Sequence, residues 1–336
     1  MKERHNQILA GALTLQIILS VVLFWPTAPA AAGGEPLFPD LEVGAVVALT
    51  ITDGDGASIA LSQADGAWFL AEADAFPANT TTVITLLAKI VGLTSDRLVA
   101  RSETSLSRLQ VAGDDFLRRV DFQTLDGEEH TFYLGSSPTY GASHIRVEGQ
   151  NETYLCDGIS SWEASVTASS WIDAAYVSVA HAEIASLLIE NAAGSFSFSK
   201  NEEGDWISDA TGDEEIVTQT EVTSIVSQAG TVSIKEPLGT TELPGYGMET
   251  PLARITLISS DQTITLTIGA QDTDDSTYVV ISSESDYYVR VHEYSVDRLV
   301  ESVRDDFFEP LATPTPEPSA TPEPTATLEA DEEAAD

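Results

Sequence analysis

The clearest signal in the chain is an alternation of apolar and polar residues that is written twice. It runs through Val47–Phe69 and again through Ala185–Ile207. Such alternation is typical of β-strands with one buried face. Four positions correspond at a constant spacing: Ile51 with Ile189, Gly56 with Gly194, Gly66 with Gly204, and Trp68 with Trp206. The constant spacing indicates an internal duplication, and each tryptophan is predicted to anchor the core of its sheet.

Apolar residues at helical spacing follow each of these strand groups. The first stripe predicts a helix that is capped by Thr81 or Thr82 and ends at Gly92. Its counterpart is Val222–Gln228, capped near Thr220 and ended by Gly230. Shorter stripes predict one more helix near the end of each copy: Ile159, Trp162 and Val166 in the first, and Val296, Leu299, Val300 and Val303, capped by Ser295, in the second.

Further alternating runs, separated by glycine-containing turns, complete each copy. We therefore predict an α+β protein of two tandem repeats, each an antiparallel β-sheet packed with one or two helices, after an N-terminal membrane helix. The predicted boundaries are 1–36 for the anchor or signal peptide with its spacer, 37–176 for the first repeat and 177–310 for the second. Residues 311–336, rich in Pro, Thr and Glu, are predicted to be a disordered tail.

Residues 8–25 are almost wholly apolar, and as a helix they would be about 27 Å long, close to the thickness of a bilayer core. Lys2 and Arg4 precede this segment and the next charge after it is Glu35, so the amino end is expected in the cytoplasm. We predict a single-pass anchor in the cell membrane, with the bulk of the chain extracytoplasmic. Cleavage as a signal peptide, at small residues near Ala28–Ala32, stays open as the alternative.

The chain is strongly acidic, with 54 Asp and Glu against 15 Lys and Arg and a formal net charge of −39. A field of this sign repels phosphates, so nucleic acid is excluded as an expected partner. Cys156 is the single cysteine, which excludes an internal disulfide and a cysteine-based zinc site. Because it lies in the strand-like run Thr153–Cys156, we expect a small buried or edge residue, with a reactive thiol as the alternative.

Motifs for catalysis, cofactor binding or metal binding do not rise above background. The sequence contains no Gly-Xaa-Ser-Xaa-Gly elbow, phosphate loop or dinucleotide fingerprint, and its histidines lack helical ligand spacing. We therefore assign no catalytic, cofactor-binding or metal residue, and we predict that the protein is not an enzyme.

Two acidic segments, Asp53–Gly56 and Asp272–Asp275, are predicted to be turns, with calcium as the alternative. In the first, an EF-hand would need an oxygen ligand at Ala57 and a glutamate at Ala64.

One strand near the carboxyl end carries the best candidate for a recognition surface. Alternation places Tyr288, Arg290 and His292 on one face of this strand. Because Tyr and Arg contribute strongly to protein interfaces, these three residues form a candidate interaction strip if the face is exposed. The alternative is core tyrosines beside edge charges.

Five arginines within a short span are expected to be paired with neighbouring acids, or else to form a docking patch for an acidic partner: Arg97, Arg101, Arg108, Arg118 and Arg119.

Several short motifs follow one another in a fixed order. They are Leu37-Phe38-Pro39, Gly66 with Trp68, Gly204 with Trp206, Tyr246-Gly247-Met248 followed by Pro251, Ile268-Gly269, Tyr278-Val279, and Arg304–Phe307. In this order they resemble a bacterial family, domain of unknown function 4340 (DUF4340), in two tandem copies over roughly Leu37–Pro310. The first copy departs from the family pattern, because Leu109-Gln110-Val111 replaces the Tyr-Gly turn. Members often occur beside gliding-type ABC transporter components, so the resemblance implies an accessory envelope protein without an established activity.

We therefore expect a membrane-anchored extracytoplasmic protein that is a non-catalytic accessory or interaction module of an ABC-transporter-type envelope assembly. One alternative is a glycan or small-molecule binder, for which an aromatic pocket between the repeats containing Trp162 or Tyr288 is expected. The other alternative is a hydrolase with a site between the repeats. Its candidate residues are His144, His181, Arg146, Asp272 and Asp274.

Overall fold

The computed structural model describes residues 34–311, which form mostly antiparallel β-sheet with few helices. Strands take up 41% and helices 18%, so the sheets define the architecture, and the expectation of antiparallel sheets accompanied by a few helices is confirmed. The expected membrane segment, residues 8–25, and all but the first residue of the expected tail lie outside the described residues. Between residues 34 and 311, no helix combines the length and the apolar character needed to cross a membrane.

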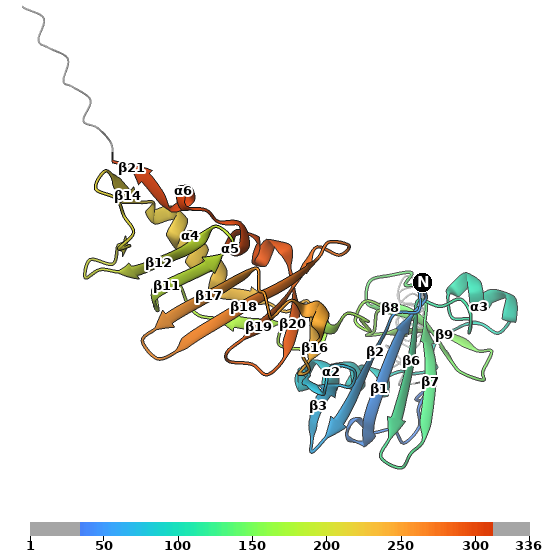
Figure 1. Ribbon diagram of the computed structural model, residues 1–336. Coiled ribbons are helices and arrows are strands. Elements are labelled where there is room, and N and C mark those ends of the chain that lie inside the picture. Colours follow the sequence, from blue (N-terminus) through green and yellow to red (C-terminus); the bar gives the residue numbers. More distant parts are fainter. Residues whose placement is uncertain (1–33, 312–336) are drawn as a thin grey trace, which may run out of the picture.

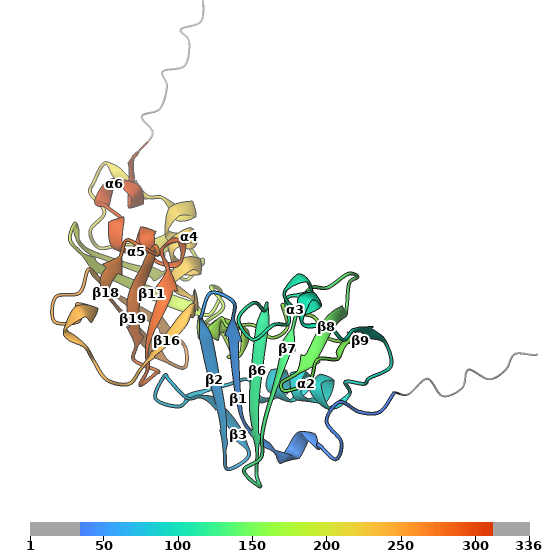
Figure 2. The same ribbon diagram turned by 90° about the vertical axis from the view of Figure 1, so that its right-hand side faces the viewer.

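The first sheet has nine antiparallel strands in the order β4-β3-β2-β1-β6-β7-β8-β9-β5 (Figure 1). These strands are β1 (Val46–Asp53), β2 (Ser58–Ala64), β3 (Ala67–Leu70), β4 (Phe76–Pro77), β5 (Leu98–Ala100), β6 (Arg118–Thr124), β7 (Glu129–Leu134), β8 (Ala142–Val147) and β9 (Thr153–Asp157). Helix α2 (Thr80–Val91) packs on one face, and Figure 2 shows it behind the sheet. The shorter helix α3 (Glu103–Leu109) packs on the opposite face, where Leu109 contacts Tyr133.

The second sheet has eight strands in the order β13-β12-β11-β17-β18-β19-β20-β16. These strands are β11 (Ile184–Asn191), β12 (Gly194–Lys200), β13 (Trp206–Ile207), β16 (Glu236–Gly239), β17 (Ala253–Ser259), β18 (Thr263–Asp272), β19 (Thr277–Ser282) and β20 (Tyr288–His292). Two ribbons flank it, β10 (Ala175–Ser178) with β15 (Thr231–Ser233), and β14 (Glu215–Val217) with β21 (Phe308–Pro310). Its helices are α4 (Gln219–Ala229), α5 (Asp297–Glu301) and α6 (Arg304–Phe307). Single 3₁₀ turns are η1 (Val43–Ala45), η2 (Ala168–Ser170), η3 (Pro244–Tyr246) and η4 (Glu293–Ser295).

The order of strands in the second sheet repeats the order in the first. The strands β3-β2-β1-β6-β7-β8-β9-β5 correspond one to one to the eight strands of the second sheet, and β4 is additional. In each sheet the chain leaves the first strands, forms α2 or α4, and then adds a strand at the far edge, β5 or β16. We call the part up to residue 174 the first lobe and the part from residue 175 the second lobe. In both views the lobes lie one beside the other, with the two described ends of the chain far apart (Figures 1 and 2).

Trp68 and Trp206 occupy equivalent places in the two lobes. Trp68 lies in β3 with 1% of its surface exposed, and Trp206 lies in β13 with 3% exposed. The carbonyl of each accepts a hydrogen bond from the start of the following helix segment: from the Ala78 N–H in the first lobe, at 2.8 Å, and from the Gln219 side chain in the second, at 2.7 Å. Each tryptophan therefore joins the outer strands of its sheet to the helix that covers them.

The turn that departs from the family pattern keeps the same backbone conformation. Gln110 has φ = 58° and Gly247 has φ = 70°, so both are left-handed. In each lobe the turn crosses directly over a glycine of the sheet, because a Cβ on Gly135 would lie 2.0 Å from the Leu109 carbonyl oxygen, and one on Gly269 would lie 2.0 Å from the Tyr246 carbonyl oxygen. The sequence difference in the first lobe therefore does not change the path of the chain.

The helix predictions require three corrections. Helix α2 is capped by Asn79, whose side chain accepts from the Thr82 N–H at 3.2 Å, rather than by Thr81 or Thr82. Helix α4 begins after Thr218 instead of near Thr220, and both α2 and α4 end at the expected glycines.

The third correction concerns the helices expected at the end of each copy. Residues 159–166 form turns instead of a helix. The predicted closing helix is reduced to α5, which begins after Val296 and ends before Ser302, so that the expected Val303 lies outside it and is exposed. Five residues are too few for a helix to be stable by itself, so α5 depends on its contacts with α4 and with the strands β11 and β17.

A polar clasp joins the two lobes, formed by Asp74, Ala75, Gly239, Thr240 and Tyr287. The Asp74 carboxylate accepts from the Thr240 N–H at 2.8 Å and from the Thr240 hydroxyl at 3.0 Å. The Tyr287 hydroxyl contacts the carbonyl oxygens of Asp74 and Ala75 at 3.3 and 3.2 Å. Gly239 permits this approach, because it has φ = +92° and a Cβ there would lie 2.6 Å from the Asp74 carboxylate. The clasp therefore connects residues that lie 166 positions apart in the chain.

The clasp is expected to weaken in acid. The hydrogen bonds from Thr240 lower the pKa of the Asp74 carboxyl below its ordinary value of 3.8. A carboxyl whose pKa is lower in the folded state contributes stability above its unfolded pKa and loses it as the pH falls through the folded pKa. The contribution of Asp74 is therefore intact at neutral pH and disappears below about pH 4.

The variant Asp74→Asn should reproduce the acid effect at neutral pH. We expect hydrogen–deuterium exchange of the Thr240 amide to become several-fold faster, because its charged acceptor is lost. Asp65→Asn is the matched control, since Asp65 also has a positive φ but lies in the β2–β3 turn. Equal exchange rates at Thr240 in both variants and the parent protein would contradict a clasp that depends on the Asp74 charge.

Candidate functional site

The candidate strip Tyr288, Arg290 and His292 lies on one face of β20. Val289 and Val291, which alternate with these residues, are fully buried on the opposite face, and the three strip residues are half-buried. Strand β20 pairs with β19 on one side and with the short edge strand β16 on the other. The strip therefore lies near an edge of the second sheet, on the face that α4 does not cover.

Arg290 is held between two carboxylates. Its guanidinium lies 3.1 Å from the Asp272 carboxylate, 3.8 Å from the Glu236 carboxylate and 3.2 Å from the Thr277 hydroxyl. These partners come from β18, β16 and β19, so the sheet positions the arginine from three sides. The two carboxylates more than offset the charge of Arg290, and the surroundings of the strip are therefore acidic.

Two tyrosines extend the strip beyond β20. The rings of Tyr288 and Tyr246 are 5.3 Å apart, and the Tyr288 hydroxyl lies 3.2 Å from the Glu242 carboxylate. Burial raises the pKa of both phenols, and Glu242 raises the pKa of Tyr288 further. Both hydroxyls are therefore neutral donors at physiological pH. Tyr246 belongs to the family motif but not to the predicted strip, because its contact with Tyr288 depends on how η3 folds back over the sheet.

The other end of the strip carries an exposed aromatic pair. The His292 ring stacks on the Tyr294 ring, with 5.1 Å between centroids and 14° between planes. Tyr294 is 71% exposed although it is large and partly apolar. Alternation could not identify Tyr294, because it lies beyond the strand in η4.

A shallow pocket with a volume of 400 Å³ adjoins Arg290. It is lined by the turn around Tyr246, by residues 270–273 at the end of β18, and by Val279 and Arg290. This volume is near the lower end of the range for ligand pockets, about 300–1,000 Å³. The pocket is large enough to receive a side chain of a partner beside the strip.

The two acidic segments form turns in which the carboxylates of Asp53, Asp272 and Asp275 are engaged. The Asp53 carboxylate accepts from the N–H groups of Asp55 and Ala57 at 3.0 and 2.9 Å. Asp272 accepts from the Asp274 N–H at 3.2 Å and pairs with Arg290, while Asp275 pairs with Lys235 at 2.9 Å. Within residues 34–311, no group of three or more His, Cys, Asp and Glu side chains is arranged to hold a metal ion.

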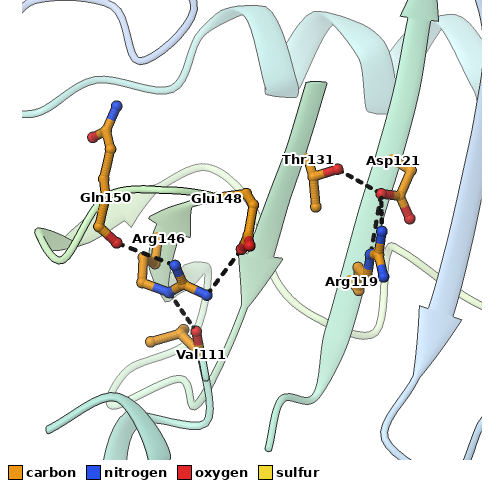
Figure 3. A network of polar contacts seen from close by, with 7 residues as sticks. All are labelled: Val111, Arg119, Asp121, Thr131, Arg146, Glu148 and Gln150. Carbon is orange, nitrogen blue, oxygen red and sulfur yellow. Dashed lines mark hydrogen bonds and ion pairs between the residues drawn. The ribbon is translucent and has the colours of Figure 1, made fainter. Parts of the chain in front are cut away.

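The residues considered for a hydrolase are spread over both lobes. His144 and Arg146 lie on β8, whereas Asp272 ends β18 and Asp274 follows it in the second lobe. Arg146 is buried, and its guanidinium donates to the carbonyls of Val111 and Gln150 and to the Glu148 carboxylate, at 2.7, 3.1 and 3.2 Å (Figure 3). The contacts fasten the turn after α3 to the sheet, so Arg146 has a structural role.

His144 contacts a serine whose other hydrogen bonds lead back to the turn after α3. Its Nδ1 lies 3.1 Å from the Ser136 hydroxyl, which also contacts the Leu109 carbonyl at 3.3 Å. The Ser136 N–H, which could stabilise an oxyanion, donates to the same carbonyl at 3.0 Å. Burial lowers the pKa of His144, so the ring is neutral at physiological pH and its Nδ1 can share a hydrogen bond with the Ser136 hydroxyl. The pair therefore serves to tie the α3 turn to β8.

Four of the five clustered arginines have partners nearby. Arg97 pairs with Asp157 at 2.5 Å, Arg101 with Glu152 at 3.7 Å and Arg119 with Asp121 at 2.8 Å, while Arg118 donates to the Ala164 carbonyl at 2.8 Å. Figure 3 shows the Arg119–Asp121 pair together with Thr131, whose hydroxyl donates to the same carboxylate at 2.6 Å. These pairings agree with a solvated, paired set rather than a continuous basic patch.

A pocket does lie between the lobes, but the expected aromatic residues do not line it. Its volume is 410 Å³, and its walls come from β2, from Glu72 and Ala73, from residues 166–168 and from residues 235–238. Neither Trp162 nor Tyr288 contributes to it.

Cys156 is buried elsewhere, and burial raises the pKa of its thiol to about 11, so the reactive-thiol alternative lacks the thiolate it needs.

A match to a protein-family model identifies the family of the chain. The family model named domain of unknown function (DUF4340) matches residues 68–240, a little over half of the chain. The protein belongs to the DUF4340 family. No curated protein and no solved structure gives a match.

The DUF4340 match is a single span rather than one span for each lobe. It begins at Trp68 in β3 and ends at Thr240, directly after β16. It therefore includes most of the first sheet, the clasp as far as Thr240, and the first part of the second sheet. The expected two tandem copies of the family domain are not what this comparison detects; it detects one.

Proposed function

We propose that this DUF4340 protein is a non-catalytic accessory or interaction module of an ABC-transporter-type assembly in the cell envelope. In this proposal the apolar segment at residues 8–25 anchors it in the cell membrane and the two lobes are extracytoplasmic. The observation that carries the proposal is the interaction strip of Tyr288, Arg290 and His292, which is half-exposed and continues into the exposed Tyr294. Aromatic and arginine side chains at a surface are typical of binding hot spots.

The proposed two-lobe organisation derives from duplication of one sheet-and-helix unit. The equal order of eight strands in both sheets and the equivalent places of Trp68 and Trp206 support it. The described amino end belongs to the first lobe, whereas β20, which carries the strip, belongs to the second lobe (Figure 1). An anchor at the amino end would therefore leave the strip free to meet a partner.

The partner surface is proposed to be basic, with apolar side chains at its centre. Arg290 is surrounded by the carboxylates of Asp272 and Glu236, and Tyr288 contacts that of Glu242. With the net charge of −39, these acids would attract a positively charged surface and accelerate its association. Such steering weakens as the salt concentration rises, because exposed charges are screened beyond about 10 Å at 0.1 M.

Site-specific crosslinking in native membranes tests the proposal. A photoreactive amino acid at position 294, beside the strip, is expected to give a discrete adduct with a transporter subunit. The substitution Tyr288→Ala combined with Arg290→Ala should reduce that adduct at least about tenfold, because it removes the proposed anchors. The same photoreactive group at position 140, where Tyr140 is 93% exposed in the first lobe, is the control. Equal adducts at both positions, or adducts with unrelated proteins at position 294, would contradict the proposal.

A further inference from the structure

One large cavity in the described part of the chain lies apart from both the strip and the boundary between the lobes. It is a groove of 600 Å³ along helix α2, which we call the Trp162 groove. Trp162 is 63% exposed, which is unusual for so large and apolar a side chain. Hydroxyl and amide side chains, two tryptophans and one ion pair form most of the wall of the groove: Asn79, Thr81, Thr82, Thr85, Lys89, Trp162, Glu163, Ser165, Ser170 and Trp171.

The turn that carries Trp162 is held in place on both sides. Glu163 forms an ion pair with Lys89 of α2, and its other oxygen accepts from the Ser160 N–H at 3.0 Å. The Glu163 N–H donates to the Ser160 carbonyl at 3.0 Å, which closes the turn. The Ala164 carbonyl accepts from Arg118 at 2.8 Å. Trp162 is therefore presented from a fixed backbone, so that binding through it needs little further ordering.

The second lobe shows what fills the equivalent groove there. The buried residues of α2 and α4 correspond at a constant spacing, which pairs Thr82, Thr85 and Lys89 with Glu221, Ser224 and Gln228. The segment that contains α5 forms hydrogen bonds with all three of these residues in the second lobe. Arg298 binds Glu221 and, at 2.6 Å, the Ser224 hydroxyl, and Gln228 contacts the Tyr294 carbonyl and Asp297 at 2.8 and 3.1 Å.

In the first lobe the equivalent segment, residues 159–166, makes one contact of this kind and leaves the side chains of Thr82 and Thr85 uncovered. Lys89 binds Glu163, much as Gln228 binds Asp297. Because residues 159–166 do not form a helix, no side chain of the described chain takes the place of Arg298 over Thr82 and Thr85. Trp162 lies at the side of this opening instead. The two lobes therefore differ at this groove. In the second lobe the chain itself closes the groove along α4, whereas in the first lobe the groove along α2 is open beside Trp162.

The chemistry of the lining selects one class of ligand. Its two charged residues, Lys89 and Glu163, neutralise each other, so the groove favours neither an anion nor a cation. The Thr82 hydroxyl has no hydrogen-bond partner among the described residues and can both donate and accept. The Thr85 hydroxyl donates to the Thr81 carbonyl at 2.7 Å, and its oxygen can still accept. A flat indole offers an apolar face to the C–H face of a sugar ring, while hydroxyls bind the ring's rim. A volume of 600 Å³ lies within the usual range for ligands.

From these observations we infer that the Trp162 groove binds a neutral saccharide, with one sugar ring stacked on Trp162 and its hydroxyl groups hydrogen-bonded by Thr82 and Thr85. This site lies in the first lobe, away from the strip. A result for or against saccharide binding therefore does not bear on the proposed interaction function. A protein with both sites would bind a glycan through one lobe and a protein partner through the other.

Titration of the full chain with neutral oligosaccharides tests the inference. The chain is kept in a detergent without a sugar headgroup, since glucosides and maltosides would compete for the groove. Maltotriose, cellotriose and tri-N-acetylchitotriose are added, and binding is measured by calorimetry. At least one trisaccharide is expected to bind, and Trp162→Ala should weaken that binding at least about tenfold. The double variant Thr82→Val and Thr85→Val keeps the shape but removes two hydroxyls, and it should weaken binding by a similar factor.

The controls separate a saccharide site from general surface effects. Tyr140→Ala removes an even more exposed aromatic side chain in the same lobe and is expected to leave the affinity unchanged. The absence of binding by all three trisaccharides at millimolar concentration would overturn the inference, as would equal affinity of the Trp162→Ala variant. A preference for an arginine-rich peptide over every saccharide would overturn it too, and would mean that the groove accepts a partner's equivalent of Arg298.

Discussion

Replacing Trp68 or Trp206 by alanine is expected to lower the free energy of unfolding by about 3–5 kcal/mol. Both side chains are almost completely buried, at 1% and 3% exposure, and each joins the outer strands of its sheet to the covering helix. Alanine would remove the buried surface and leave a cavity that the surrounding strands fill only in part. The measurement is urea denaturation followed by far-ultraviolet circular dichroism, which does not depend on tryptophan emission.

Trp162→Ala provides the matched control for this prediction, because it removes the same side chain from an exposed position. It should change the free energy of unfolding by no more than about 0.5 kcal/mol. The comparison of the two buried sites is also informative. If one of the two buried replacements proved as harmless as Trp162→Ala, the two tryptophans would not be equivalent anchors, and the proposed duplication would lose its main support.

Replacing Gly135 or Gly269 by alanine is expected to cost about 3 kcal/mol or more, at the upper end of the range for overpacking. At each glycine the added Cβ would lie 2.0 Å from a backbone carbonyl oxygen, that of Leu109 or Tyr246. A backbone carbonyl cannot rotate away as the end of a long side chain can, so the turn itself must move. In the first lobe this movement would also disturb the contact between Leu109 and Tyr133.

Two other glycines allow the effect to be separated from a general glycine-to-alanine change. At Gly44 and Gly245 an added Cβ would have no neighbouring atom within 4 Å, and neither residue has a positive φ. Gly44→Ala and Gly245→Ala should therefore be neutral or stabilise by up to about 1 kcal/mol, because alanine restricts the unfolded chain. The prediction fails if Gly269→Ala and Gly245→Ala give denaturation midpoints that agree within error.

The alternating segments were the most predictable part of this fold. In Ile264–Ile268, for example, the apolar residues are buried and the threonines between them are not, as a period of two requires. Both tryptophans are buried in the expected strands. These features could be predicted because successive side chains of a strand point to opposite faces, so burial can be derived from neighbouring residues alone.

Helical spacing of three apolar residues was a weaker guide. Ile159, Trp162 and Val166 have this spacing, yet the segment forms turns and Trp162 is exposed. The segment is held by distant partners instead: Glu163 binds Lys89, which lies 74 positions earlier in the chain, and the Ala164 carbonyl accepts from Arg118. Such a tertiary contact competes with the intrinsic tendency of a short segment to be helical, and helices of this length have little stability of their own.

The candidate site was predicted in its positions but not in its contacts. Alternation identified Tyr288, Arg290 and His292 as residues of one face. It could not indicate that Arg290 would lie between Asp272 and Glu236, because these residues belong to different strands and meet only through the order of the sheet. The same limit applies to Tyr246, which reaches Tyr288 through the η3 turn.

The sequence by itself determined which face of each strand is buried, where the covering helices end, and that one pattern occurs twice, because these properties depend on residues close together in the chain. Only the tertiary structure decided what lies over each helix. In the second lobe Arg298 closes the surface of α4, whereas in the first lobe the surface of α2 stays open beside Trp162. The physical reason is that closing a groove requires hydrogen bonds between segments that are 74 residues apart in the chain, which no local pattern of apolar and polar residues specifies.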